Sequence, residues 1–181
     1  MTCYNASMLM TQEALAEQLG TSERTLRRLS EVGMLRARRD WRRLKPGEGE
    51  WLISHWQMVR ALREALRTEK GVKSVLIFGS VAKGTDGPDS DLDLAVDMED
   101  DEDLMVRRAL RKRLEAAVGR KIDMFSLRDL ESEPSYLPSF LLNIMKDARP
   151  VVDREGWWAS LSAHKRAWRA RRARGLARRG R

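Results

Sequence analysis

The sequence predicts an α/β (α+β) fold, in which a small mixed sheet and its helices follow an all-α pair of short helices. Residues 75–78 form a β-branched and aromatic run that stops at a glycine, as a buried strand does. Residues 91–96 alternate acidic and apolar side chains, which indicates a second strand with one buried face. Apolar residues at helical spacing fill the segments around these strands, and such an order is typical of layered α/β domains.

The charge distribution divides the chain further. Its 181 residues carry a net charge of +8, but residues 74–155 hold 12 Lys and Arg against 18 Asp and Glu, whereas residues 156–181 hold 9 against none. An acidic middle between basic ends is typical of a metal-binding catalytic domain flanked by nucleic-acid-binding elements. We predict four parts: a two-helix domain, a connecting helix, a catalytic domain and a basic tail, at residues 1–45, 46–70, 71–155 and 156–181.

Several classes of protein are disfavoured by composition. Cys3 is the only cysteine, which excludes a disulfide within the chain and a thiolate metal cluster. No apolar stretch approaches the roughly 20 residues of a membrane helix, so we expect a cytoplasmic protein without a membrane partner. His55 and His164 lie far apart without other ligand types nearby, and we expect both to be packing or surface residues.

Two short helices are predicted before residue 34. Thr11 is a plausible N-cap for a helix at 11–18 that ends at Gly20, and Thr21 or Ser22 offers a second cap for a helix that Gly33 stops. Two helices joined by a three- to four-residue turn form a helix-turn-helix, and this one resembles that of many bacterial transcriptional regulators. Similar helical hairpins also occur as scaffolding, which is the alternative.

If the pair binds DNA, its second helix lies in the major groove. The side chains expected to reach bases and phosphates are Ser22, Arg24, Thr25, Arg27 and Arg28. Residues 35–44 then hold five arginines, which suit either a hairpin or wing along a phosphate backbone or a solvated basic loop. These arginines are Arg36, Arg38, Arg39, Arg42 and Arg43.

Two longer helices are predicted around the strands. Residues 46–68 repeat apolar and tryptophan side chains at helical spacing, with Pro46 in the first turn, and we expect them to connect the two domains. The acidic run 99–103 is expected to be a solvated loop and helix start. Residues 104–118 follow as an amphipathic helix with Leu110 and Leu114 inward.

The C-terminal third is less patterned. We expect a loop and then a helix at 139–146, and a short edge strand at 149–153, where proline is tolerated. Residues 157–174 are helix-prone. The arginine-rich tail is either solvated or bound electrostatically to nucleic acid.

The chemistry is predicted between the two strands. Gly79 allows a tight turn, and Ser80 begins a one-turn helix whose N–H groups can hold a triphosphate. Asp91 and Asp93 share one strand face with Cα atoms roughly 6 to 7 Å apart, which suits a pair of Mg²⁺ ions. Asp123 lies in another alternating segment and is the best third ligand and proton acceptor. The neighbouring Asp89 and Asp97 are expected to be solvated.

Gly79-Ser80, ten intervening residues and Asp91-Leu92-Asp93-Leu94 resemble the signature of the DNA polymerase beta-like nucleotidyltransferases, most of all the minimal nucleotidyltransferases, over residues 72–153. The resemblance implies that the two motif carboxylates bind both metals, that Asp123 completes the site, and that the turn contacts the nucleotide phosphates. Further candidate nucleotide contacts in and after the turn are Lys83, Gly84 and Ser90.

The resemblance implies Mg²⁺-dependent transfer of a nucleoside monophosphate, expected to be AMP from ATP, to a hydroxyl. We expect a macromolecular acceptor, which is a protein side chain on a cognate HEPN-type toxin or the end of a tRNA. Two alternatives remain: a DNA-binding regulator whose nucleotidyltransferase fold only senses a nucleotide, and a structural partner in a toxin–antitoxin complex.

Overall fold

The structure is a computed structural model that describes residues 10–37, 44–101, 103–128, 146–156 and 158. The expected loop and helix after residue 128, His164, the basic tail and the arginines at 38–43 lie outside these residues. The described elements are, in chain order, α1 (Gln12–Gln18), α2 (Glu23–Glu31), α3 (Glu48–Arg67), β1 (Val72–Phe78), α4 (Gly79–Lys83), β2 (Leu92–Met98), α5 (Leu104–Val118), β3 (Ile122–Ser126) and β4 (Arg149–Asp153).

The strands form one mixed four-stranded sheet in the order β3-β2-β1-β4. β1 pairs antiparallel with β2 and with β4, and β2 pairs parallel with β3. The fold class predicted from the sequence is therefore confirmed, and β4 is an edge strand as expected. Since α5 is the crossover between the parallel strands β2 and β3, it must return across one face of the sheet.

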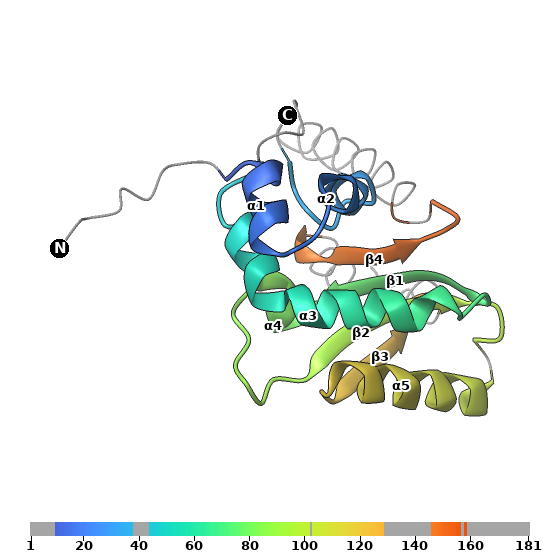
Figure 1. Cartoon of the computed structure of the whole chain (residues 1–181). Helices are drawn as coiled ribbons and strands as arrows, with labels where there is room; N and C mark the ends of the chain where they lie inside the picture. The colour runs from blue at the N-terminus through green and yellow to red at the C-terminus, as the bar shows by residue number, and fades with distance from the viewer. Residues whose placement is uncertain (1–9, 38–43, 102, 129–145, 157, 159–181) are drawn as a thin grey trace, which may run out of the picture.

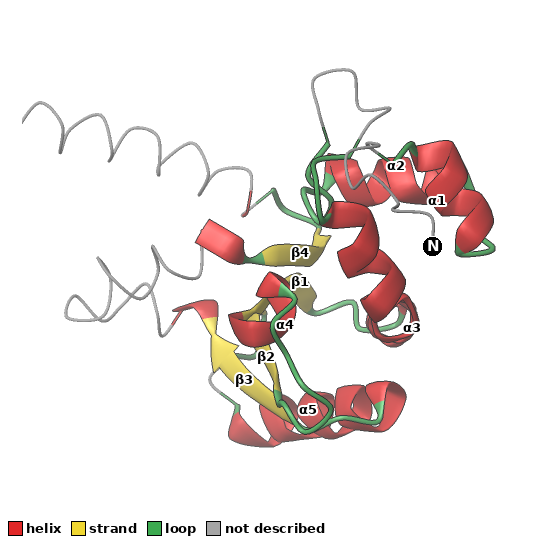
Figure 2. Ribbon diagram, turned by 90° about the vertical axis from the view of Figure 1, so that its left-hand side faces the viewer, coloured by secondary structure: helices red, strands yellow, loops and turns green. Residues whose placement is uncertain are grey.

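α3 and α5 cover the same face of the sheet, as the two views in Figures 1 and 2 show. The period-two pattern of β2 explains why, because Leu92, Leu94 and Val96 all point into the main hydrophobic core. The predicted inward residues of α5, Leu110 and Leu114, are buried in that core. The opposite face of β2 carries the acidic side chains, and this places the candidate site on the face away from these helices.

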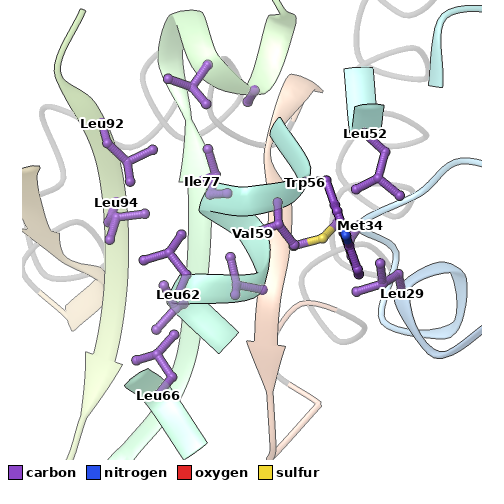
Figure 3. Packing of buried hydrophobic residues seen from close by; sticks show 14 of the residues in the cluster. Leu29, Met34, Leu52, Trp56, Val59, Leu62, Leu66, Ile77, Leu92 and Leu94 are labelled. Atoms are coloured by element: carbon purple, nitrogen blue, oxygen red, sulfur yellow. The ribbon is translucent and has the colours of Figure 1, made fainter. Parts of the chain in front are cut away.

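α3 also packs against the first helices, so one core runs through the molecule. Figure 3 shows Leu62 and Leu66 on the side of α3 toward the sheet, while Trp56 lies beside Met34 and Leu29. Both tryptophans of α3 are core residues, since Trp51 is 5% and Trp56 9% exposed. The division into separate domains stays a prediction.

The helix ends follow local capping chemistry. Thr11 and Ser22 are the N-caps of α1 and α2, and each side chain accepts a hydrogen bond from the third N–H beyond it. Pro46 was expected in the first turn of α3, and this is wrong. Gly47 takes a left-handed conformation, φ 82°, at the N-cap, so the helix begins at Glu48. An antiparallel bridge joins Ala37 to Leu44, one on each side of residues 38–43. Whether the arginine-rich segment is a hairpin or a solvated loop stays a prediction.

A buried ion pair joins the two halves of the fold. The guanidinium of Arg149 lies 2.6 Å from Glu48 Oε2 and 3.8 Å from the centre of the Trp51 ring, and both charged side chains are at most 6% exposed. Arg149 also donates to the carbonyls of Met34 and Ala82. Burial lowers the pKa of Arg149, and Glu48 opposes that shift. One side chain on β4 thereby connects α3, α4 and the segment after α2.

Part of the acidic run was also misjudged. Asp101 was expected to be solvated, but it is 4% exposed and accepts a hydrogen bond from Ser126, while Arg107 Nε lies 3.8 Å away. Asp103 does cap α5 as expected. Asp97 is half-buried near Arg128, and burial is the main cause that raises its pKa. None of the helices in the described ranges combines the length and apolar character needed to cross a membrane.

We predict that Arg149→Met lowers the free energy of unfolding by about 3 to 5 kcal/mol, because it leaves Glu48 charged and buried without its partner. Chemical denaturation measures this. Arg27→Met is the matched control, since Arg27 pairs with Glu31 on the surface, where both side chains are more than half exposed. Equal small effects of the two variants would contradict a structural role for the buried pair.

Candidate active site

The turn after β1 is built around a glycine that no other residue can replace without strain. Gly79 has φ +69°, and a Cβ atom there would overlap the carboxylate of Asp93. The expected strand, glycine turn and single-turn helix are all present, with α4 beginning at Gly79. No side chain caps α4, and no hydrogen bond of the described residues engages the Ser80 hydroxyl. The first N–H groups of α4 therefore have no side-chain acceptor.

Strand register brings the candidate carboxylates together. Asp93 pairs across the sheet with Phe78, the residue before the glycine turn, and on its other side with Asp123 in the parallel strand β3. Neighbouring strands lie about 4.8 Å apart, so these two carboxylates are adjacent. Asp91 lies one residue before β2 and shares the face of Asp93 by alternation. Three carboxylates thus gather beside the turn.

A lysine lies between two of these carboxylates. Lys121 Nζ is 2.7 Å from Asp91 Oδ2 and 3.8 Å from Asp123 Oδ1. The hydrogen bond to Asp91 and then the charge of Asp123 raise the pKa of Lys121. Sequence reasoning did not single out this residue. The signal was available, because a strand of period two places residue 121 on the face of residue 123.

Asp93 has the most strained electrostatic environment of the three. Burial raises the pKa of its carboxyl group, and the charges of Asp123 and then Asp91 raise it further. Ionised Asp93 is therefore disfavoured in the protein alone, and a bound cation would remove the repulsion. Similar like-charge groupings are frequent in sites that bind metals or transfer protons.

These residues suit Mg²⁺ by the chemistry of their donor atoms. Carboxylate oxygens are the ligands that Mg²⁺ takes in nucleotide sites. Among the residues that the structure describes, no three carboxylate, histidine or cysteine side chains converge on one point as metal ligands do. Lys121 instead neutralises Asp91 and Asp123 in this conformation. Its side chain is 68% exposed, so it can move aside for a metal ion.

The loop that leads to Asp91 is held at both ends. Ser90 Oγ accepts a hydrogen bond from Gly87 N at 2.9 Å. Asp86 contacts His55 Nε2 and Arg120 NH1, each at 3.0 Å. His55, expected to be a packing or surface residue, is a buried packing residue that holds this loop. Asp86 and Arg120 were not anticipated, since their partners are more than 30 residues away in sequence.

The remaining candidate nucleotide contacts lie apart from the carboxylates. Lys83 and Gly84 line a cavity of about 400 Å³ between α3 and α4, together with Trp51 and Arg149. Asp91, Asp93 and Asp123 do not line it. The Lys83 side chain is exposed, and so is Asp89 as expected. The structure therefore brings together the turn and the acidic residues, and it places Lys83 at the far end of α4.

The candidate DNA contacts all lie on or next to α2. Arg24 and Arg28 are exposed, and the described structure gives neither an ion pair. Arg27 is also exposed but pairs with Glu31 at 3.0 Å. The Ser22 hydroxyl serves as the helix cap and contacts that of Thr25, which is half-buried.

Comparisons with known proteins match a part of the chain that includes the turn and the acidic residues. The family model described as polymerase beta, nucleotidyltransferase matches residues 60–155. Protein adenylyltransferase MntA of Thermococcus cleftensis is 33% identical over 75 residues, which are 41% of this chain and 76% of that protein.

The chain is also similar to solved structures. One, provisionally described as a minimal nucleotidyltransferase, is 34% identical with a TM-score of 0.41, covering 52% of this chain and 96% of that chain. Another, an AMPylated HEPN toxin with its MNT antitoxin from Shewanella oneidensis, is 18% identical with a TM-score of 0.37, covering 70% and 98%. TM-scores this low add nothing to the sequence matches.

We predict that Asp93→Asn raises the melting temperature of the protein alone and abolishes its increase with Mg²⁺ and ATP. The variant removes a carboxylate that burial and two like charges disfavour, and with it a predicted metal ligand. Because the folded-state pKa is raised, the destabilisation by wild-type Asp93 grows as pH rises above about 4. The gain from the variant is therefore larger at pH 7 than at pH 4. Asp89→Asn, the matched control, should leave both measurements unchanged.

For Lys121→Met we predict the opposite change in both quantities, the melting temperature of the protein alone and its increase with Mg²⁺. Loss of the ammonium leaves Asp91, Asp93 and Asp123 without a cation, so the melting temperature of the protein alone falls at pH 7. The increase with Mg²⁺ becomes larger, because no lysine competes for the same oxygens. Lys112→Met on the exposed face of α5 removes the same charge elsewhere. If both lysine variants behaved alike, Lys121 would not be the counter-ion of this site.

Proposed function

The chain belongs to the polymerase beta family of nucleotidyltransferases, and on that premise we propose that it transfers AMP from ATP to a hydroxyl group of a macromolecule. The observation that carries the proposal is the register of Asp93, which lies between Gly79 of the turn and Asp123 of β3. In this arrangement the N–H groups of the turn and the acidic side chains would contact the same ATP molecule.

In the proposed reaction the acceptor oxygen attacks the α-phosphorus of ATP as the bond to the bridging oxygen breaks, and pyrophosphate leaves. Asp123 accepts the hydroxyl proton, because its side chain is 48% exposed, against 36% for Asp91, and can meet an incoming acceptor. The N–H groups of α4 and the Ser80 hydroxyl hold the phosphates. Asp91 and Asp93, with Asp123 completing the ligand set, would hold Mg²⁺, which neutralises phosphate charge when it is bound.

The open position of the carboxylates supports a macromolecular acceptor. Asp91 and Asp123 are 36% and 48% exposed, on side chains at or beside the edge strand β3. A small molecule needs concave walls on several sides, whereas a partner protein brings its own surface. We propose a tyrosine or serine hydroxyl of a cognate HEPN-type toxin as the acceptor, in an antitoxin-like role. A tRNA end is the second choice.

The proposal predicts label transfer from [α-³²P]ATP with Mg²⁺ to the product of the neighbouring gene, and none to aminoglycosides. Asp91→Asn with Asp93→Asn should lose all transfer while staying folded, with Asp89→Asn as the active control. Label on aminoglycosides alone would contradict a macromolecular acceptor. Nucleotide binding without transfer to either the partner or tRNA would instead favour the nucleotide-sensing regulator.

A second proposed activity is DNA binding by α1 and α2. Two observations favour it: Arg24 and Arg28 on α2 are exposed and form no ion pair with another described residue, and a bridge joins Ala37 to Leu44 at the ends of the arginine-rich segment. Arg27 contributes less in this arrangement, because its guanidinium already pairs with Glu31. Titration of labelled duplex DNA, followed by fluorescence anisotropy, tests this binding directly.

A further inference from the structure

A second cavity, of about 430 Å³, lies between the start of α2, the C-terminal half of α3 and β4. Most of its charged lining is arginine, and we call it the arginine groove. Its lining residues are Thr21, Thr25, Trp56, Arg60, Arg63, Glu64, Leu66, Arg67, Val152 and Arg154. Four arginines face one glutamate, and that glutamate is already paired with Arg67 at 3.0 Å. The groove therefore carries an excess of positive charge.

Arg63 is the least exposed of these arginines. Its side chain is half-buried, and its NH1 donates a 2.9 Å hydrogen bond to the carbonyl of Val151. It has no carboxylate partner within the described structure. Burial lowers the pKa of Arg63, and so does the nearby positive charge of Arg28. Two like charges brought together in a half-buried place favour the binding of an anion.

The other arginines differ in what they can offer. Arg60 lies one turn before Arg63 on the same face of α3, is exposed, and has no ion pair among the described residues. Arg154 instead donates to the carbonyls of Leu66, Glu69, Lys70 and Val72, so it closes the C-terminal end of α3. Arg60 and Arg63 are therefore the groups available to a ligand, and Arg154 is structural.

The groove continues the surface of α2. Thr25 and Arg28 lie three residues apart on α2 and so share one face of the helix, and Thr25 lines the groove together with Thr21, which precedes the helix cap. The aromatic lining side chain, Trp56, is 9% exposed and packs beside Met34, so it offers no open ring face to a nucleobase (Figure 3). This argues against a free nucleotide and for a phosphodiester that enters beside α2.

We propose that the arginine groove binds a backbone phosphate of duplex DNA whose major groove holds α2, with Arg60 and Arg63 as the contacts. Guanidinium groups bind phosphate oxygens through two parallel hydrogen bonds, and such contacts position a protein without reading sequence. The site rests on the proposed DNA binding by α1 and α2. It extends the DNA-binding surface from the helix pair to α3, which also packs on the catalytic sheet.

The test is anisotropy of the full-length protein with a labelled random-sequence DNA duplex over a range of salt concentrations. Arg60→Ala and Arg63→Gln should each weaken binding several-fold and lower the slope of log Kd against log salt by about 0.9. Arg108→Ala, at an exposed position of α5, should leave that slope unchanged. Arg60→Ala breaks no hydrogen bond or ion pair among the described residues, so we expect the fold to be kept, and melting temperatures verify this for each variant.

The outcomes separate this site from the proposal on which it rests. Failure of the wild type to bind duplex DNA overturns both. Binding that Arg28→Ala weakens but Arg60→Ala and Arg63→Gln leave unchanged overturns the groove alone. Thermal stabilisation by inorganic phosphate that Arg63→Gln removes, with DNA affinity unchanged, identifies a free-phosphate site and overturns the DNA assignment. The DNA assignment is also overturned if the variants change the salt slope for tRNA but not for duplex DNA.

Discussion

The buried pair of Arg149 and Glu48 is the interaction on which the arrangement of the whole molecule depends. Its guanidinium contacts the carbonyl that ends α4, the carbonyl of Met34 and the ring of Trp51, while Glu48 also accepts from the backbone N–H of Arg36. The charges of such a pair are expensive to bury, and only a complete set of partners offsets that cost. The one-turn helix α4 after Gly79 and the segment after α2 are consequently held by the same side chain.

The strand register brings carboxylates together at the candidate site, and a bound cation would relieve the repulsion between them. Asp93 is brought beside Asp123 by parallel pairing and against Gly79 by antiparallel pairing, and the raised pKa of Asp93 records the repulsion. Lys121 partly neutralises the group from the solvent side. An exposed ammonium is easily displaced, whereas the backbone positions of the carboxylates are set by the sheet. The sheet thus holds the carboxylates in positions where a cation could replace the ammonium of Lys121.

Local patterns in the sequence were enough to predict the strands, the turn and the three carboxylates, because alternation and glycine position directly determine which side chains share a face. Local patterns also predicted α5 as an amphipathic helix and β4 as a short edge strand. They failed for Asp101, whose acidic neighbours suggested solvent exposure, since its partner Ser126 comes from a distant strand. Arg149 and Glu48 are 101 residues apart, and no periodicity reveals such a pair. Polar contacts between residues far apart in the sequence could therefore not be predicted. The position of Lys121 could have been, because strand alternation places it on the face of Asp123.

The central claim is that Asp91, Asp93 and Asp123 form a metal site for a nucleotide held by the turn at Gly79. A crystal structure with Mn²⁺ and a non-hydrolysable ATP analogue tests it most directly, because anomalous scattering locates the metal. The account predicts manganese bound by these carboxylates, the analogue's phosphates at the start of α4, and Lys121 displaced from Asp91. Manganese bound elsewhere, or a nucleotide in the cavity lined by Lys83 and Trp51 with Lys121 still on Asp91, would contradict it.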